Sequence, residues 1–305
     1  MSWSYEEYWK KAKQYYDRAN TEGHDKPLYG FWSSLTLEFL ARATLAKIHP
    51  ALLADTKDNN GENLLYAFGL LKATKKQPKS IMASSVFSRC AVVYPEKFSK
   101  EDVSFCVGMA EQRNSELHSG DNAFEKWPNQ IWLAQYYRVC SIHLSIQGRA
   151  LADLFERDET RAAEQMIESL EDKWRAEANK AAGMAKAKFA SFSEEKRAEL
   201  RSVQSVDFHK WSEFVICPAC GISAMRWGDP VHMGETRLVN DKIIWDVSVL
   251  PTNFKCYSCG LELKGHGLLH AAGVGGQFSL TEEEDPLAYY APDEAPEPDY
   301  DDWGR

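Results

Sequence analysis

The chain has 305 residues, which is enough for about two domains. Its 44% hydrophobic residues can form a sizeable core, and its 27% charged residues are ordinary for a soluble protein. The net charge is −9, but residues 281–305 contain ten acidic residues and one basic residue, so residues 1–280 hold 35 of each. This balance excludes a strongly basic protein that coats nucleic acid, although it leaves room for a local basic groove.

Hydropathy and cysteine usage bear on the cellular location. No apolar run approaches the ~18 residues of a membrane span, and the first residues lack the pattern of a signal peptide. Four of the seven cysteines form two C-x-x-C pairs, which fits a metal site with three free thiols better than a secreted disulfide framework. The sequence therefore predicts a soluble, cytoplasmic protein with no membrane partner.

The first 150 residues have the apolar periodicity of helices. One predicted helix ends before Pro50, because proline cannot continue it. Ser99 and Asp102 form the capping signal of another, and the polar run 119–122 ends it. Further helices are expected over 61–73 and from about 128 to 147. Residues 1–150 therefore predict a helical bundle.

The remaining chain divides into three parts. Residues 151–210 are rich in Ala, Glu, Lys and Arg and predict long helix broken near 191–194, acting as a spacer or a dimerisation hairpin. The β-rich run 243–249 predicts a small β module over 211–278. Residues 279–305 are expected to form an acidic tail that is disordered in isolation. The predicted fold class is mainly α.

Two matching cysteine pairs point to a metal site. Cys217 and Cys220 form one pair, Cys256 and Cys259 the other, and a glycine follows each pair. Each pair places two thiolates on a tight turn, and four thiolates give a closed tetrahedral site that suits structural Zn²⁺. The module resembles a zinc ribbon, with an inserted hairpin in the 35 residues between the pairs. An iron–sulfur cluster is the alternative occupant.

A second motif lies at the end of the helix that Ser99 begins. Arg113, Asn114 and His118 form an R-N-x-x-x-H pattern. Arginine precedes histidine at a similar spacing five times, as in Arg18 and His24, but only Arg113 is followed by a polar residue. Val103, Cys106, Ala110, Arg113 and Leu117 share one helical stripe. We therefore expect a polar cleft or a partner beside the Arg113 guanidinium.

The Arg113 to His118 motif resembles the signature of the HEPN superfamily, helical-bundle proteins of which many are ribonucleases. The resemblance covers roughly residues 1–150 and implies a homodimer whose site combines two copies of the motif. A dimeric site fits the helix geometry, since Arg113 and His118 lie about 140° apart on one helix. The structural alternative is a snorkelling Arg113 and a last-turn His118 on the helix dipole.

The resemblance implies a metal-independent endoribonuclease acting on an RNA substrate, with toxin or antiviral-defence roles known in the superfamily. His118 accepts the 2′-hydroxyl proton, Arg113 binds the developing charge on the phosphate, and Asn114 orients the phosphate or the histidine. A regulatory protein partner is a further expectation. The alternative function is a non-enzymatic assembly subunit, in which the bundle dimerises and the zinc ribbon binds nucleic acid or protein.

The acidic tail carries aromatic residues among its carboxylates. This composition resembles the charge and stacking features of single-stranded nucleic acid, so the tail could compete with RNA for a basic groove. The alternative is a solvated extension that only increases solubility.

Overall fold

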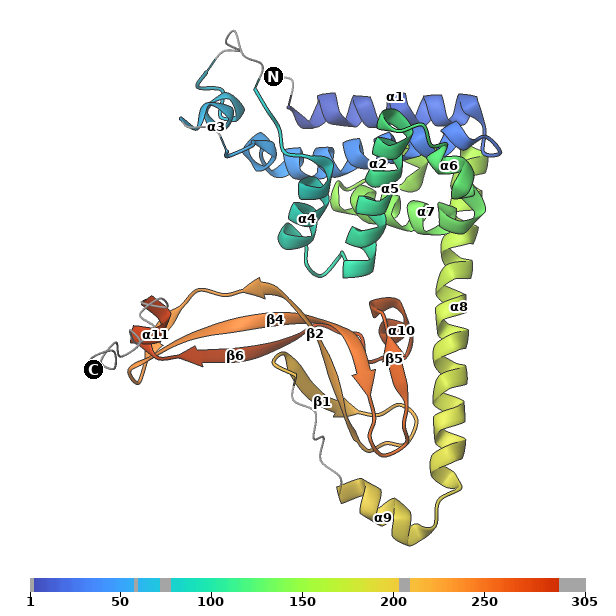
Figure 1. Cartoon of the computed structure of the whole chain (residues 1–305), viewed down its shortest axis with the longest axis vertical. Helices are drawn as coiled ribbons and strands as arrows, with labels where there is room; N and C mark the ends of the chain where they lie inside the picture. Colours follow the sequence, from blue (N-terminus) through green and yellow to red (C-terminus); the bar gives the residue numbers. More distant parts are fainter. Residues whose placement is uncertain (1–2, 58–59, 72–77, 203–208, 291–305) are drawn as a thin grey trace, which may run out of the picture.

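The computed structural model describes residues 3–57, 60–71, 78–202 and 209–290. A helical body at the N-terminal end and a β module at the C-terminal end are joined by one long helix, α8 (Arg157–Ala190) (Figure 1). The mainly α class is confirmed, with a curled antiparallel sheet near the C-terminus.

The helical body is built around α2 (Pro27–Ile48), whose side chains are buried on every side of the helix. Helix α1 (Tyr5–Glu22) packs along it, and α5 (Lys100–His118) and α7 (Asn129–Ile146) also contact it. The other elements of the body are η1 (Pro50–Leu53), α3 (Glu62–Ala67), α4 (Ala83–Val93), α6 (Ala123–Lys126) and η2 (Leu151–Asp153). An encircled α2 explains why its sequence is apolar with little amphipathic pattern.

Local signals placed several helix ends correctly. Helix α2 stops at Ile48, just before Pro50, and the Ser99–Asp102 capping box begins α5. Helix α5 ends at His118 and α7 covers the range expected from 128 to 147. The helix expected over 61–73 is shorter, since α3 ends at Ala67.

Helix α8 spans from the body to the β module. Its 34 residues correspond to about 51 Å of helix. Thr160 and Ala163 are buried near its beginning, against the body, whereas Ala185 and Phe189 are buried in the core of the β module. The chain then breaks at Ser191, as the capping signal predicted, before the short α9 (Glu194–Ser202).

The β module is organised on one long strand. Strand β4 (Lys242–Lys255) pairs in antiparallel fashion with four other strands. The remaining strands and helices are β1 (Ser212–Ile216), β2 (Ser223–Met233), β3 (Arg237–Val239), β5 (Glu262–Lys264), α10 (His266–Ala271), β6 (Phe278–Glu284) and α11 (Pro286–Tyr290). Strands β2, β3 and the whole of β4 lie between Cys220 and Cys256, where an inserted hairpin was expected.

Strand β6 continues the sheet past residue 279, where the acidic tail was expected to begin. Phe278 pairs with Val249 and Glu284 with Ile243, so the module continues through the first acidic residues. The alternation of Phe278 and Leu280 with polar residues supplies the side chains that cover Val247 and Val249. The rest of the predicted tail, residues 291–305, lies outside the described residues.

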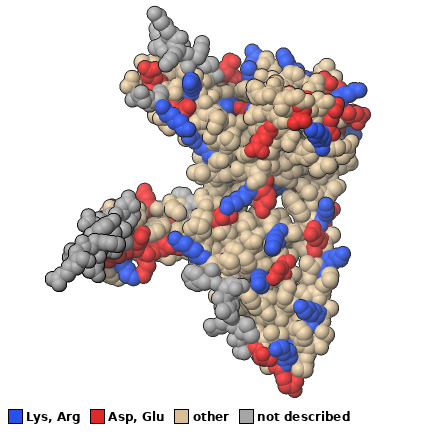
Figure 2. All heavy atoms as spheres, in the orientation of Figure 1, with Lys and Arg blue, Asp and Glu red and all other residues tan. Residues whose placement is uncertain are grey.

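The described surface is not divided into acidic and basic faces in the view drawn. Lys and Arg side chains are interspersed with Asp and Glu over both the helical body and the β module (Figure 2). Among the described helices, none is both long and apolar enough to cross a bilayer.

A buried histidine in the helical body makes the stability of the fold dependent on pH. His143 on α7 is fully buried, and its Nδ1 lies 3.0 Å from the Thr44 hydroxyl. Burial lowers the pKa of His143 to about 3. The unfolded chain takes up this proton near pH 6.5 and the folded chain only near pH 3, so stability is lost as the pH falls through that window.

We expect His143→Leu to remove about 2 kcal/mol from the stability difference between pH 7 and pH 5. Urea unfolding of wild type and variant at the two pH values measures this difference. His118→Leu is the matched control, because His118 is exposed. An unchanged pH dependence in His143→Leu contradicts a neutral, buried imidazole.

Candidate metal centre and arginine cluster

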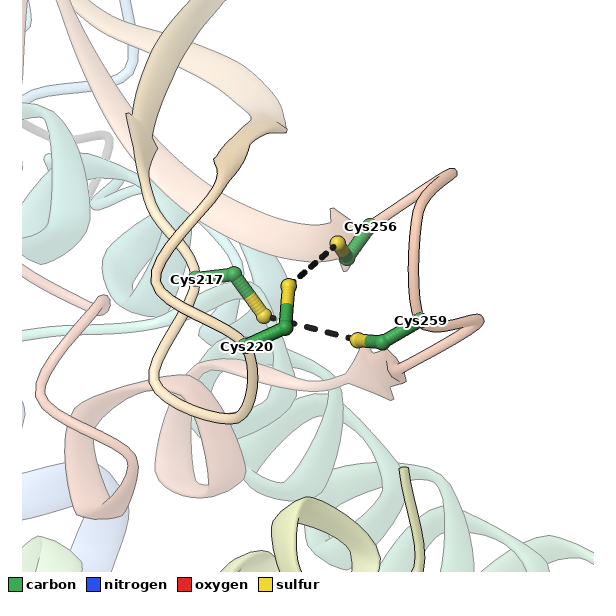
Figure 3. A group of neighbouring side chains, drawn as sticks. All are labelled: Cys217, Cys220, Cys256 and Cys259. Atoms are coloured by element: carbon green, nitrogen blue, oxygen red, sulfur yellow. Dashed lines mark hydrogen bonds between the residues drawn. The ribbon is translucent and has the colours of Figure 1, made fainter. Parts of the chain in front are cut away.

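The four cysteines predicted as metal ligands converge in the β module. Their Sγ atoms all lie within 4.8 Å of one another, and they form the cluster of Cys217, Cys220, Cys256 and Cys259. Two of the Sγ–Sγ separations, Cys217 to Cys259 and Cys220 to Cys256, are 3.6 Å. A tetrahedral Zn²⁺ with Zn–S bonds of ~2.3 Å requires separations of about 3.8 Å. Figure 3 shows the four sulfurs pointing toward one another.

Backbone turns hold the cysteines in place. The first pair lies in the turn between β1 and β2, where the Gly221 N–H donates to the Cys217 carbonyl at 3.0 Å. The second pair lies between β4 and β5, where the Gly260 N–H donates to the Cys256 carbonyl at 2.8 Å. Both glycines have φ near +75°, at 72° and 78°, a conformation that other residues rarely adopt. The glycine after each pair is therefore required by the turn.

The metal site is part of a hydrophobic core. Cys217, Cys256 and Cys259 are buried among apolar side chains of the sheet and of α8, including Phe254 and Phe189. Hydrogen bonds from Cys217 and Cys259 lower the pKa of the Cys256 thiol. Thiolate formation inside an apolar core is stabilised by a dication, so the donor set fits one structural Zn²⁺. Four sulfur ligands leave no position for a substrate.

The three cysteines outside this cluster are core residues of the helical body. Cys90, Cys106 and Cys140 are all buried. Burial raises the pKa of each thiol, which leaves them protonated and unreactive at neutral pH.

The second predicted site contains a cluster of charged side chains at the α2–α5 contact. The Arg113 guanidinium donates through Nη1 to the Glu38 carboxylate of α2, and through Nη2 to Asn114 Oδ1 at 2.9 Å. Glu38 also accepts from Arg42 Nε at 2.9 Å and from Arg42 Nη2 at 2.7 Å. The partner expected beside Arg113 is therefore a carboxylate from another helix.

This arginine cluster, Glu38, Arg42 and Arg113, keeps a net positive charge. Its side chains are only about one tenth exposed. Burial favours the neutral form of Glu38, but Arg42 and Arg113 outweigh burial and lower the pKa of its carboxyl group. Two guanidinium groups and one carboxylate sum to +1, so the cluster attracts an anion.

The other two motif residues lie on the solvent side of α5. Asn114 is exposed and is turned toward Arg113, and His118 is exposed in the last turn of the helix. The described hydrogen bonds of Arg113 reach Glu38 and Asn114, and none of them includes His118. The apolar stripe also ends earlier than predicted, because Leu117 is exposed by 57% while Cys106 and Ala110 are buried.

Glu38 and Arg42 were not identified from the sequence. They are an i,i+4 pair of charged residues within the most apolar helix of the body. Two charged residues surrounded by apolar ones are the only feature of the sequence that could have indicated a buried ion pair. Their relation to Arg113 depends on a tertiary contact between residues 75 positions apart. Periodicity within one helix does not report such a contact.

We expect Glu38→Gln to destabilise the helical body by about 3 kcal/mol, because two buried guanidinium groups lose their carboxylate. Stabilisation by Glu38 is present above its unfolded pKa and is lost as the pH falls through its lower folded pKa. Chemical denaturation at pH 7 measures the loss. Glu111→Gln, an exposed change on α5, is the control. Equal stabilities of the two variants contradict a stabilising role of Glu38 in the helical body.

Comparison with known proteins adds no family assignment. No family model, no curated protein and no solved structure matches the chain. The resemblance to the HEPN superfamily therefore stays a prediction that depends on Arg113, Asn114 and His118. The chain is a mainly α protein with a four-cysteine cluster suited to a metal such as zinc.

Proposed function

We propose that the protein is a metal-independent endoribonuclease of the HEPN type, stabilised by one structural Zn²⁺. The observation that carries the proposal is the Arg113 guanidinium, held by Glu38 and Asn114 five residues before the exposed His118 on the same helix. Arginine, a polar neighbour and histidine are the groups that RNA cleavage by an internal 2′-hydroxyl requires.

In this mechanism the substrate supplies its own nucleophile. His118 accepts the proton of the 2′-hydroxyl, whose oxygen attacks the adjacent phosphorus. The bond from phosphorus to the 5′-oxygen breaks, and a protonated histidine returns a proton to that oxygen. The positive arginine cluster stabilises the negative charge that develops on the phosphate oxygens. Glu38 acts as a positioning residue, because it fixes the guanidinium without contacting RNA.

A homodimer belongs to this proposal. Arg113 and His118 are five residues apart on α5, so their side chains project about 140° apart around the helix axis. One copy cannot aim both groups straight at one phosphate, whereas two copies of the exposed end of α5 can supply Arg113 and His118 together. We propose the cytoplasm as the location of this reaction and RNA as the substrate.

The buried ion pair favours a second candidate function. The side chains of Glu38, Arg42 and Arg113 are each about one tenth exposed. Such burial is typical of an ion pair whose role is to hold two helices, here α2 and α5, together. In that case the helical body is a non-enzymatic assembly subunit and the zinc ribbon binds nucleic acid or protein. This candidate function predicts that replacing Arg113 lowers the stability of the protein, and that replacing His118 changes neither stability nor cellular RNA.

One expression experiment separates the two functions. We expect wild-type protein to fragment cellular RNA and His118→Ala to leave it intact, with both proteins folded to the same thermal stability. Total RNA from expressing cells is analysed by gel and by sequencing of cleavage ends. Intact RNA in both cultures, with soluble dimeric protein present, supports the assembly subunit instead.

A further inference from the structure

A cleft of about 450 Å³ lies where the helical body meets the β module. Its walls come from the α4–α5 connection, α7, α8 and α10, so both parts of the protein contribute. The side chains that matter for its chemistry are Lys97, Arg138, Trp174, Arg175, His266 and His270. A second hollow of about 350 Å³ shares Arg138, Trp174 and His266 and extends the cleft toward the N-terminal end of α5.

Arg138 is fixed in this cleft from two directions. Its Nη1 donates to Asp102, a fully buried carboxylate that also accepts from Gln135 Nε2 at 2.7 Å and caps α5. Its guanidinium carbon lies 5.3 Å from the centre of the Trp174 ring. The side chain is still 19% exposed, and its described hydrogen bond uses one of five N–H donors. The other donors are free to bind a ligand in the cleft.

Close packing of α10 against α8 fixes the distance between two walls of the cleft. A Cβ atom at Gly267 would lie 2.8 Å from the Trp174 indole, so a side chain at this position would push the β module away. Glycine at 267 therefore lets α10 approach, and it carries His266 and His270 to the wall of the cleft. The imidazole rings are 6.0 Å apart.

The charged side chains around the cleft suit a ligand that carries both an anionic group and hydrogen-bond donors. Lys97, Arg138 and Arg175 are positive, and Glu96 and Glu171 are negative. Asp102 pairs with Arg138 and Asp172 pairs with Arg175, each through one Nη1 donor, so both guanidinium groups have further N–H donors for a ligand. A phosphate group binds the guanidinium groups in bidentate fashion. Amino groups of a nucleobase are donors for the two carboxylates. The volume is within the ~300–1,000 Å³ typical of small-molecule sites.

We propose that this cleft binds a nucleotide, with its phosphate on Arg138 and Arg175 and its base toward His270 and the carboxylates. The ligand would contact the helical body and the β module at once and hold them together. The site is separate from the proposed ribonuclease motif, because Asp102 and Arg113 are eleven residues, or about 16 Å, apart along α5. The inference therefore does not depend on RNA cleavage.

Isothermal titration calorimetry of the full-length, zinc-loaded protein tests the site. The probes are AMP, ATP and GTP, with adenosine and inorganic phosphate as partial ligands. We expect at least one nucleotide to bind, and to bind tenfold or more tightly than adenosine or phosphate. Arg138 also compensates buried Asp102, so its replacement would disturb folding, and the exposed Arg175 and His270 carry the test.

Arg175→Gln and His270→Gln are each expected to weaken nucleotide binding about tenfold without changing thermal stability. Arg161→Gln is the matched control, since Arg161 is an exposed arginine on the same helix outside the cleft. Absence of nucleotide binding at millimolar concentration overturns the proposal. Equal affinity for adenosine, or an equal effect of Arg161→Gln, also overturns it. None of these results depends on whether Arg113 cleaves RNA.

Discussion

Replacement of Cys256 by serine is expected to unfold the β module while the helical body stays folded. The cysteine cluster lies at the centre of the module's small apolar core, so the metal and the core form together. Apparent binding free energies for structural zinc are about 10–16 kcal/mol at neutral pH, which is as large as the stability of a whole domain. The long sheet on β4 cannot compensate such a loss.

The measurements are metal content and secondary structure. Elemental analysis is expected to find one zinc per chain in wild type and almost none in Cys256→Ser. Circular dichroism should show loss of strand signal with helix retained. Cys106→Ala is the control, because this cysteine is buried in the body and its loss should leave the zinc content at one. Iron with visible absorbance, or no metal in wild type, contradicts the zinc assignment.

Removal of either end of the motif is expected to abolish RNA cleavage. Arg113→Ala and His118→Ala should each lower the cleavage rate by at least about 100-fold, the contribution of general acid–base catalysis or of one electrostatic donor. Activity should persist in EDTA, because the reaction uses the 2′-hydroxyl and side chains alone. Products should carry a 2′,3′-cyclic phosphate and a 5′-hydroxyl, and DNA should stay intact.

Two features of the design separate catalysis from folding. His24→Ala is the matched control, since His24 is partly exposed and follows Arg18 at a similar spacing outside the motif. Equimolar mixing of folded Arg113→Ala and His118→Ala should restore part of the activity if two chains share a site. Products ending in 5′-phosphate, or loss of activity in EDTA, point to a different mechanism.

The features that sequence predicted well are those set by neighbours along the chain. A proline, a capping box and a glycine after each C-x-x-C pair act within a few residues, and the helix ends and cysteine turns lie where these signals placed them. The strand β6 was not predicted, because its acidic composition resembled a tail and its partner β4 is about 35 residues away. Glu38 was missed for the same reason, since it meets Arg113 only in the folded protein.

Helix α8 connects the helical body to the β module as one continuous helix, so its direction sets where the β module lies. A rod of about 51 Å converts a bend of about 5° at one end into a displacement of about 4 Å at the other. Between the two ends of α8, Ala178 is buried and the half-buried Trp174 packs against Gly267 of α10. The Lys100–Asp229 ion pair joins α5 to β2 as well, so a bend in α8 would have to disturb both this ion pair and the packing of Trp174.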